Sequence, residues 1–171
     1  MSDILGKMTA VFIAILALIY IPILSLSLKM ENTTRSMIET YVTQFVDNAR
    51  ATGKITPEEY ESCYSKIALC QDFCTLEMTH SSRMYAAGEE EAVGYYSDFN
   101  TRDILDVMYN SDTDEIPYEM RNGDYFTVTV KNAKPTLATR LYRLFLKRGS
   151  SDTSIYVTYS GIVGNYIEVD E

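Results

Sequence analysis

The chain has 171 residues, with 15 lysines and arginines against 24 aspartates and glutamates, so its formal net charge is -9. Apolar residues make up 46% of it, and it has only 8 glycines and 4 prolines, which excludes a disordered or low-complexity polymer. The acidic balance leaves too few basic residues to neutralise several phosphates, so no nucleic acid is expected as a partner. The length is typical of one folded domain.

An uncharged apolar segment lies near the N-terminus. From Met8 to Leu28 there are 21 consecutive residues without a charged side chain, and a helix needs about 20 such residues to cross a bilayer core about 30 Å thick. A cleaved secretory signal is the alternative, but its apolar region is usually about 7 to 15 residues long and ends in small residues. This segment ends in Leu24, Leu26 and Leu28. We therefore expect residues 1–30 to be a single-pass membrane anchor.

The acidic charge lies outside this segment. Residues 1–30 carry a net charge of +1, so the other 141 residues carry -10. Few basic residues follow Lys29, and three cysteines suit an oxidising compartment. We therefore expect the N-terminus in the cytoplasm and residues 31–171 as an extracytoplasmic α+β domain, located at the cell membrane or, after assembly, in an extracellular filament.

The anchor helix is predicted to continue beyond the bilayer. No glycine or proline occurs between Lys29 and Arg50, and the apolar residues recur at helical spacing: Met37, Ile38, Tyr41, Val42, Phe45, Val46 and Ala49. This pattern predicts one helix over about residues 4–52, in which residues 31–52 form an amphipathic continuation that Gly53 ends. Pro22 has no amide hydrogen, so we expect a kink inside the bilayer.

The rest of the sequence mixes helix and strand signals without a repeating strand–helix–strand order. Thr56, Pro57 and Glu59 have the spacing of a capping box and predict a helix to about residue 69. Further expected elements are strands over 74–86, 93–99, 124–131 and 154–169, a short helix after Asn100 or Thr101, and a helix over 137–147 capped by Thr136. We therefore expect an α+β fold in which a small antiparallel sheet packs on the long helix, with additional short helices.

No catalytic or cofactor site is recognisable. The sequence lacks GxSxG, Walker, GxGxxG and HExxH motifs, so we expect neither enzymatic activity nor a cofactor. His80, the only histidine, continues the buried face of its predicted strand and is expected to be a packed side chain. Asn110, Asp112 and Asp114 resemble the start of a calcium loop, but Glu115 stands where an EF-hand needs glycine. A solvated acidic turn is therefore favoured over an irregular calcium site.

Three cysteines allow at most one internal disulfide. Cys63 and Cys70 would lie about 10 Å apart along a helix axis, which is too far for a bridge. The predicted pair is therefore Cys74 with either Cys63 or Cys70, provided that the chain turns back after Leu69. The sequence has no CxxC motif, which disfavours an oxidoreductase.

Four segments together resemble one protein family. They are FVDNARATGKITPEEYESC (45–63), EMTH (77–80), GDYFTVTVKNAKPTLATRL (123–141) and IYVTYSGIVGNY (155–166). They are similar to single-pass proteins of Gram-positive bacteria that occur with Tad-type type IV pilus and type II secretion-like components. The resemblance implies a pilin-like or pilus-accessory role, with copies of the chain, other pilin-like subunits and the assembly platform as partners. A pilin would have glutamate at the fifth position after the glycine, whereas Val11 occupies that position after Gly6.

Assembly would occur through the apolar helix, which also contacts membrane lipid. Its small or slender positions allow neighbouring helices to approach closely; together with the proline, the residues of this assembly helix are Ala10, Ala14, Ala17, Pro22 and Ser25. The alternative function is a membrane-tethered sensor or adhesin domain that binds a ligand or surface without polymerising.

Overall fold

A computed structural model of the chain describes residues 2–70, 74–86, 93–109, 116–134, 136, 139–140 and 155–164. The chain divides into two compact units. The first unit contains residues 1–34 and 135–154, and the second contains residues 35–134 and 155–171. The fold is α+β, as predicted, with one long N-terminal helix, short helices and a small antiparallel sheet.

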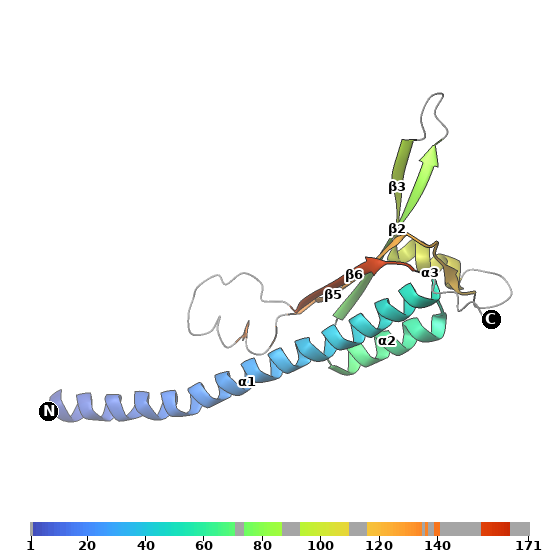
Figure 1. The fold of residues 1–171 in the computed structure, drawn as a ribbon. Coiled ribbons are helices and arrows are strands. Elements are labelled where there is room, and N and C mark those ends of the chain that lie inside the picture. The colour runs from blue at the N-terminus through green and yellow to red at the C-terminus, as the bar shows by residue number, and fades with distance from the viewer. Residues whose placement is uncertain are drawn as a thin grey trace. The chain divides into compact units, whose positions relative to one another are not determined.

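Helix α1 (Ser2–Thr52) is continuous and contains Pro22 in its interior (Figure 1). The predicted long helix is therefore confirmed, and the kink at Pro22 stays a prediction. The helix ends at Gly53, which has a φ of 69° and donates its amide hydrogen to the carbonyl of Ala49 at 2.9 Å. Glycine adopts this left-handed conformation without steric cost, which is why it ends the helix here.

Helix α2 (Pro57–Cys70) begins with the predicted capping box. The Thr56 amide donates to the Glu59 carboxylate at 3.1 Å, and the Glu59 amide donates to the Thr56 hydroxyl at 3.3 Å. These two bonds satisfy backbone donors that a helix start otherwise leaves without partners.

The main sheet has four antiparallel strands in the order β3-β2-β5-β6 (Figure 1). Its members are β2 (Cys74–Ala86), β3 (Val93–Asn100), β5 (Tyr125–Asn132) and β6 (Tyr156–Ile162). Each was expected from the sequence, although residues 165–169 of the last predicted strand lie outside the described residues. A second sheet pairs β1 (Lys54–Ile55) with β4 (Tyr118–Glu119). The sequence did not predict it, because two-residue strands are too short to show an alternating pattern.

The core of the second unit lies between the main sheet and the C-terminal part of α1. Phe45 of α1 and Phe126 of β5 meet edge to face, with ring centroids 6.1 Å apart. Around them are buried apolar side chains from α1, the sheet and helix α3 (Thr101–Tyr109), namely Ile38, Val42, Val46, Ala49, Leu76, Met78, Ile104, Met108, Val128, Val130 and Val157. The sheet therefore packs on the amphipathic part of the long helix, as the spacing of its apolar residues predicted.

Thr101, one of the two residues expected to cap the short helix, joins α3 to β2 instead. The Met78 amide donates to the Thr101 hydroxyl at 2.6 Å, and that hydroxyl donates to the Met78 carbonyl at 3.2 Å. At the same helix start, the Asn100 amide donates to the Asp103 carboxylate at 2.9 Å. The helix is thus held at its first turn by both a local and a long-range contact.

Arg50, near the end of α1, lies against the edge strand β6. Its Nε donates to the Ile162 carbonyl at 2.8 Å, and its own carbonyl accepts the Gly164 amide at 3.1 Å. A Cβ atom added at Gly161 would lie 2.3 Å from Arg50 Nε. Glycine is therefore needed at this position if the guanidinium is to stay against the strand.

In the first unit, Thr136 acts as the predicted helix cap. The Arg140 amide donates to the Thr136 carbonyl at 3.0 Å, and the Thr139 amide donates to the Thr136 hydroxyl at 3.2 Å. The same hydroxyl donates to the Glu31 carboxylate of α1 at 2.9 Å. Residues 137–138 and 141–147 of the predicted helix lie outside the described residues.

Candidate functional site

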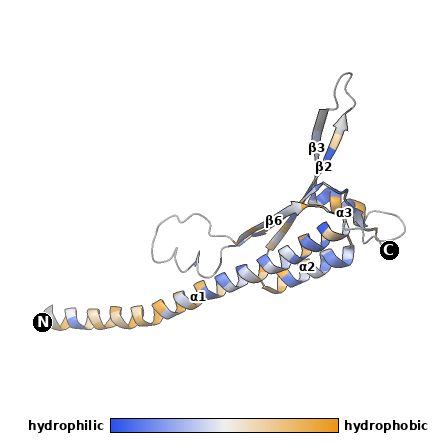
Figure 2. Cartoon of the chain, viewed as in Figure 1, coloured by the Kyte–Doolittle hydropathy of each residue, from blue (hydrophilic) through white to orange (hydrophobic). Residues whose placement is uncertain are grey.

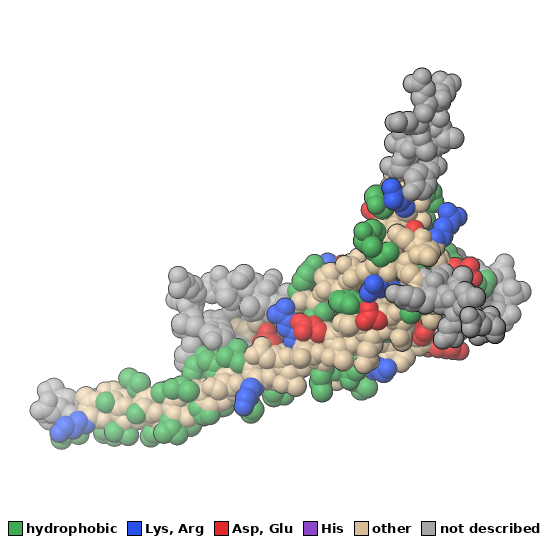
Figure 3. All heavy atoms as spheres, in the orientation of Figure 1, with side chains coloured by type: hydrophobic (Ala, Val, Ile, Leu, Met, Phe, Trp, Pro, Cys, Tyr) green, Lys and Arg blue, Asp and Glu red, His purple; other side chains and the backbone are tan. Residues whose placement is uncertain are grey.

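The N-terminal part of α1 has a continuous apolar surface, seen as the mostly orange end of the helix in Figure 2. Among its exposed large apolar residues the exposed fraction runs from 46% for Ile23 to 76% for Leu18, whereas Leu24 and Leu28 are half-buried. No charged residue occurs from Met8 to Leu28, and Figure 3 shows hydrophobic side chains along this part of the helix. A helix of this length and composition could cross a membrane, and an N-terminal signal sequence would share both properties.

Two polar side chains in this apolar segment, those of Thr9 and Ser27, bond to the helix itself. The Thr9 hydroxyl lies 3.1 Å from the Leu5 carbonyl and 2.9 Å from the Gly6 carbonyl, and the Ser27 hydroxyl donates to the Ile23 carbonyl at 2.9 Å. Such local bonds lower the cost of placing hydroxyls in lipid, where no water can satisfy them. This part of the helix is therefore chemically compatible with an apolar surrounding.

The residues of the predicted assembly helix, which are four small positions and the proline, are all on the exposed surface of α1, namely Ala10, Ala14, Ala17, Pro22 and Ser25. Their exposure leaves them accessible to a neighbouring helix or to lipid. Close approach of a second helix at these positions stays a prediction, since its basis is the size of the side chains.

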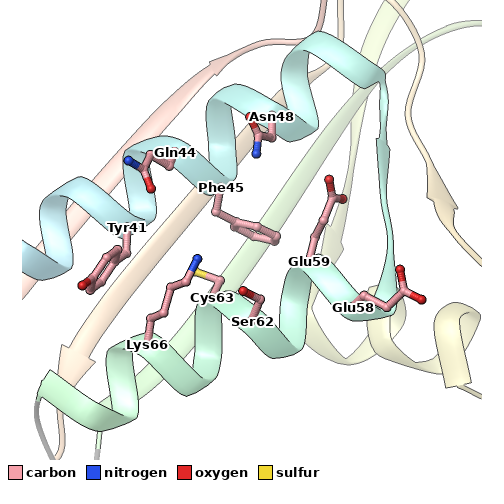
Figure 4. Close-up of a pocket in the computed structure, with 9 residues that line it drawn as sticks. All are labelled: Tyr41, Gln44, Phe45, Asn48, Glu58, Glu59, Ser62, Cys63 and Lys66. Atoms are coloured by element: carbon pink, nitrogen blue, oxygen red, sulfur yellow. The ribbon is translucent and has the colours of Figure 1, made fainter.

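A pocket of about 230 Å³ lies between α1 and α2 in the second unit (Figure 4). Its wall combines amide, carboxylate, hydroxyl and ammonium groups with two apolar side chains and a tyrosine; the lining residues are Tyr41, Gln44, Phe45, Asn48, Glu58, Glu59, Ser62, Cys63 and Lys66. Lys66 Nζ lies 6.0 Å from the centroid of the Tyr41 ring, and Glu59 is already bonded in the capping box. The sequence did not predict this pocket, because its walls come from two helices whose relative packing no local pattern specifies.

His80 lies at the centre of a buried polar cluster. Its Nε2 is 2.9 Å from the Asp124 carboxylate and its Nδ1 is 2.8 Å from the Tyr118 hydroxyl. Asp124 can only accept when ionised, so Nε2 donates to it, and Nδ1 shares a second hydrogen bond with the Tyr118 hydroxyl. The ring also stacks on Phe99, with centroids 5.5 Å apart. His80 is thus buried and bonded on both nitrogens, which agrees with the expectation of a packed side chain.

Asp124 fixes the chain before β5 to strand β2. Burial disfavours its charged form, but the hydrogen bond from His80 and those from the Arg121 and Arg83 amides outweigh burial and lower the pKa of Asp124. Burial, and then the charge of Asp124, raises the pKa of Tyr118 to about 12. The carboxylate is therefore ionised and the phenol protonated at neutral pH.

Ser82, His80 and Asp124 are the residue types of a nucleophilic triad, but their connections differ from one. The Ser82 hydroxyl donates to Asp124 at 3.2 Å, and His80 bonds Asp124 and Tyr118. In a triad the histidine instead accepts the proton of the serine. Ser82, His80 and Asp124 are each at most 4% exposed, so the arrangement joins structural elements and does not present a nucleophile.

All three cysteines are free thiols, and the predicted disulfide is not formed in the structure. Cys63 is buried, whereas Cys70 and Cys74 are half-buried. Burial raises the pKa of the Cys63 thiol to about 11. Cys63 is therefore protonated and unreactive at neutral pH, because the thiolate is the nucleophilic form.

The weak calcium candidate, Asn110, Asp112 and Asp114, lies outside the described residues. Within the part of the chain that the structure describes, no group of three or more histidine, cysteine, aspartate or glutamate side chains could hold a metal ion.

Comparisons with known proteins find no relative of the chain. No protein-family model, no curated protein and no solved structure matches the chain. What bears on function is therefore the residues, their geometry and the resemblance carried by the four sequence segments.

Proposed function

We propose that the chain is a non-enzymatic, membrane-anchored structural subunit or accessory protein of a Tad/type IV pilus or type II secretion-like assembly. It would assemble through the N-terminal part of α1 with copies of itself or with other pilin-like subunits. One observation carries the proposal, namely the exposed apolar surface of α1 around the uncharged residues Met8–Leu28.

The size of this surface requires an apolar surrounding. The 21 uncharged residues span roughly 32 Å at a rise of about 1.5 Å per residue, which matches a bilayer core about 30 Å thick. Monomeric soluble proteins rarely expose apolar patches this large. Lipid covers this apolar surface before assembly, and neighbouring helices cover it in a filament. One segment therefore serves both to hold the unassembled subunit in the membrane and to pack the assembled subunits.

The rest of α1 supports a separate domain. Ile38, Val42 and Val46 are fully buried in the core with the sheet, so most of the apolar stripe of this part of the helix is already covered within the chain, although Met37 is 48% exposed. Assembly would then depend on the first part of the helix and stability on the second. With the N-terminus in the cytoplasm, the sheet-bearing unit lies outside the cell.

The direct test places a bulky side chain at the small positions. We expect Ala14→Trp and Ala17→Trp to remove the chain from the sheared, high-molecular-weight fraction of intact cells, because indole prevents close helix approach. Ala68→Trp is the matched control, since Ala68 is exposed on α2 outside the apolar segment. Immunoblots of sheared and membrane fractions report assembly, and limited proteolysis reports folding. Normal incorporation of both helix variants would overturn assembly through this helix.

The N-terminus of each recovered band separates a filament subunit from an accessory protein. Mass spectrometry of chain in the sheared fraction would identify a subunit whose apolar helix has left the bilayer. Chain found only in the membrane fraction, with Met1 or Ser2 intact, would identify a permanently anchored accessory protein.

A membrane-tethered binding or sensor domain is the second candidate, and the pocket between α1 and α2 favours it. The amide and charged groups of that pocket, including Gln44, Asn48 and Lys66, suit a small polar ligand. This function predicts a monomer in detergent and an active domain after deletion of residues 1–30. The assembly function predicts loss of function in the same deletion.

A further inference from the structure

A side-chain contact in the first unit brings a distant part of the chain to the end of the uncharged segment of α1. The Thr136 hydroxyl donates to the Glu31 carboxylate at 2.9 Å, although 105 positions separate them in the sequence. Glu31 lies three residues after Leu28, the last residue of the uncharged segment, which is about 4.5 Å along the helix axis. Thr136 is therefore held at the level where this segment would leave a bilayer.

The contact lies on the face of α1 that is shielded from solvent in this unit. Half-buried residues recur there at spacings of three and four, namely Tyr20, Leu24, Ser27, Leu28, Glu31 and Thr34. Thr136 and Thr139 are buried, and their hydroxyls are bonded to each other at 3.0 Å. The Thr136 turn is therefore packed at the end of the apolar segment and is not a free surface loop.

Two exposed basic residues lie at the same level. The Arg140 amide donates to the Thr136 carbonyl at 3.0 Å, so Arg140 lies one helical turn, about 5 Å, after the cap. Arg140 is exposed, and so is Lys29, two residues before Glu31 on α1. Glu31 brings one negative charge, and its carboxylate is bonded to Thr136. Long basic side chains at such a boundary extend their charged ends toward the headgroups while their stems lie on apolar surface.

The sequence concentrates positive charge in the segment that follows Thr136. Residues 135–151 have no acidic residue and four basic ones, namely Arg140, Arg143, Lys147 and Arg148. Since residues 31–171 together carry -10, the rest of that range carries -14. Of the four basic residues, Arg140 is the one that the structure describes. A basic segment beside apolar residues is typical of chains that lie on a negatively charged membrane surface.

We propose that Lys29 and Arg140 form a surface that binds the headgroups of anionic phospholipids where α1 leaves the bilayer. Their ammonium and guanidinium groups would pair with the lipid phosphate, and the Thr136–Glu31 bond holds Arg140 at that level. The ligand is a phospholipid with a net negative headgroup, such as phosphatidylglycerol. This surface meets lipid only if α1 crosses a bilayer, so it rests on the proposed membrane anchor.

A second negatively charged surface is available to these cations, namely the acidic part of another copy of the chain. The position of the cations favours lipid. Lys29 directly follows the uncharged segment, so it lies within the screening length of about 8 Å from the headgroups of a bilayer that this segment crosses. An acidic domain is also repelled by an anionic bilayer, and basic residues between the two would offset that repulsion.

The experiment uses the full-length chain in a neutral detergent, titrated with phosphatidylglycerol or phosphatidylcholine, and counts the retained lipids by native mass spectrometry. We expect preferential retention of phosphatidylglycerol, weakened by raising the ammonium acetate concentration. Arg140→Gln and Lys29→Gln should each lower the affinity for phosphatidylglycerol about fivefold and leave phosphatidylcholine unaffected. Arg140→Lys should keep most of the preference. Arg102→Gln is the matched control, because Arg102 on α3 has a side chain that is 90% exposed in the second unit.

A further variant tests the position of the charge separately from its amount. Thr136→Val removes the bond to Glu31 without changing the net charge, and it should also lower the retention of phosphatidylglycerol. Circular dichroism should show unchanged unfolding of the second unit in this variant. An unchanged lipid preference in Thr136→Val would contradict the role of the contact.

Three other outcomes would overturn the lipid surface. They are equal retention of the two lipids by wild type, the same loss of phosphatidylglycerol in Arg102→Gln as in Arg140→Gln, and lipid-independent dimers that Arg140→Gln abolishes, which would identify a second copy as the partner. Equal retention would leave the membrane anchor intact. A chain that stays soluble without detergent and retains neither lipid would instead contradict the anchor itself.

Discussion

The two parts of α1 belong to one continuous helix, yet they have opposite surroundings. Leu18 in the first part is 76% exposed, whereas Val46 in the second part is fully buried. The first part is apolar on every side, and the second has an apolar stripe with polar residues off it (Figure 2). A helix that is apolar on every side requires an apolar surrounding, whereas a striped helix requires one partner surface.

This difference shows that helix formation and helix burial are separate properties of the sequence. Both parts lack glycine except at Gly6, and Pro22 does not interrupt the helix. The sheet provides the partner for the second part, and the proposed function provides lipid or other subunits for the first. Substitutions can therefore separate folding of the sheet-bearing unit from membrane association.

The largest expected effect comes from one charge placed in each part. Val46→Asp puts an unpaired carboxylate into the core and should destabilise the second unit by about 4 kcal/mol or more. Leu18→Asp should leave unfolding of that unit unchanged and reduce membrane insertion, because a charge at the centre of a membrane helix is costly. Circular dichroism in detergent measures the first effect, and carbonate extraction of membranes measures the second.

Leu18→Asn and Val46→Thr are uncharged variants of similar shape. Leu18→Asn should reduce membrane insertion less than Leu18→Asp does, and Val46→Thr should lower unfolding stability less than Val46→Asp does. Equal loss of unfolding stability in the Leu18 and Val46 variants would contradict the separation of the two parts. It would show that the first part of α1 contributes to the folded core of the second unit.

Substitution of Asp124 should have the next largest effect on unfolding stability, and it should affect only the sheet-bearing second unit. Asp124→Ala removes the acceptor for His80 and Ser82, so the free energy of unfolding should fall by about 2–3 kcal/mol. Membrane association should not change. Thermal unfolding and carbonate extraction of the same preparations test both expectations.

The lowered pKa of Asp124 also gives the direction of a pH effect. Its contribution to stability is fully present above the unfolded-state pKa, which is about 3.9, and is lost as pH falls through the lower folded-state pKa. Wild type should therefore lose stability on acidification below about pH 4, with a smaller loss in Asp124→Asn. Denaturant titrations across this range measure the slopes, and identical slopes would exclude Asp124 as the cause.

The smallest expected effect comes from the capping box of α2. Thr56→Ala removes the hydroxyl that accepts the Glu59 amide and should cost about 1 kcal/mol of unfolding free energy. Thr56→Ser keeps the acceptor and is the matched control. Chemical denaturation resolves this difference, and equal stability of the alanine and serine variants would show that the cap contributes nothing here.

The sequence predicted elements whose signals are local. The apolar spacing of Ile38, Val42 and Val46 gave the helix and its buried face, and Gly53 and the Thr56 capping box gave the boundaries. The strand ranges 74–86 and 124–131 were predicted in the same way, and β5 shows the underlying alternation, since its buried Phe126, Val128 and Val130 alternate with less buried residues. Such signals are readable because each depends on residues within a few positions of one another.

Features that depend on distant residues were not predicted. The pairing of β1 with β4 joins residues far apart in the chain, and so does the bond between His80 and Asp124. His80 was recognised as packed from its strand face, but nothing nearby in the sequence pointed to its partners. The pocket between α1 and α2 was missed for the same reason, because it depends on how two helices pack.

Arg50 has a further consequence for the solubility of the sheet. Strand β6 lies at an edge and has no charged residue or proline, a composition that favours pairing with strands of other chains. The guanidinium donates to the Ile162 carbonyl while it pairs with Asp47 at 3.0 Å, and Gly161 leaves the space for it. The end of α1 therefore blocks one pairing group of this edge, so the helix that is proposed to promote ordered assembly at one end would oppose strand pairing with other chains at the other.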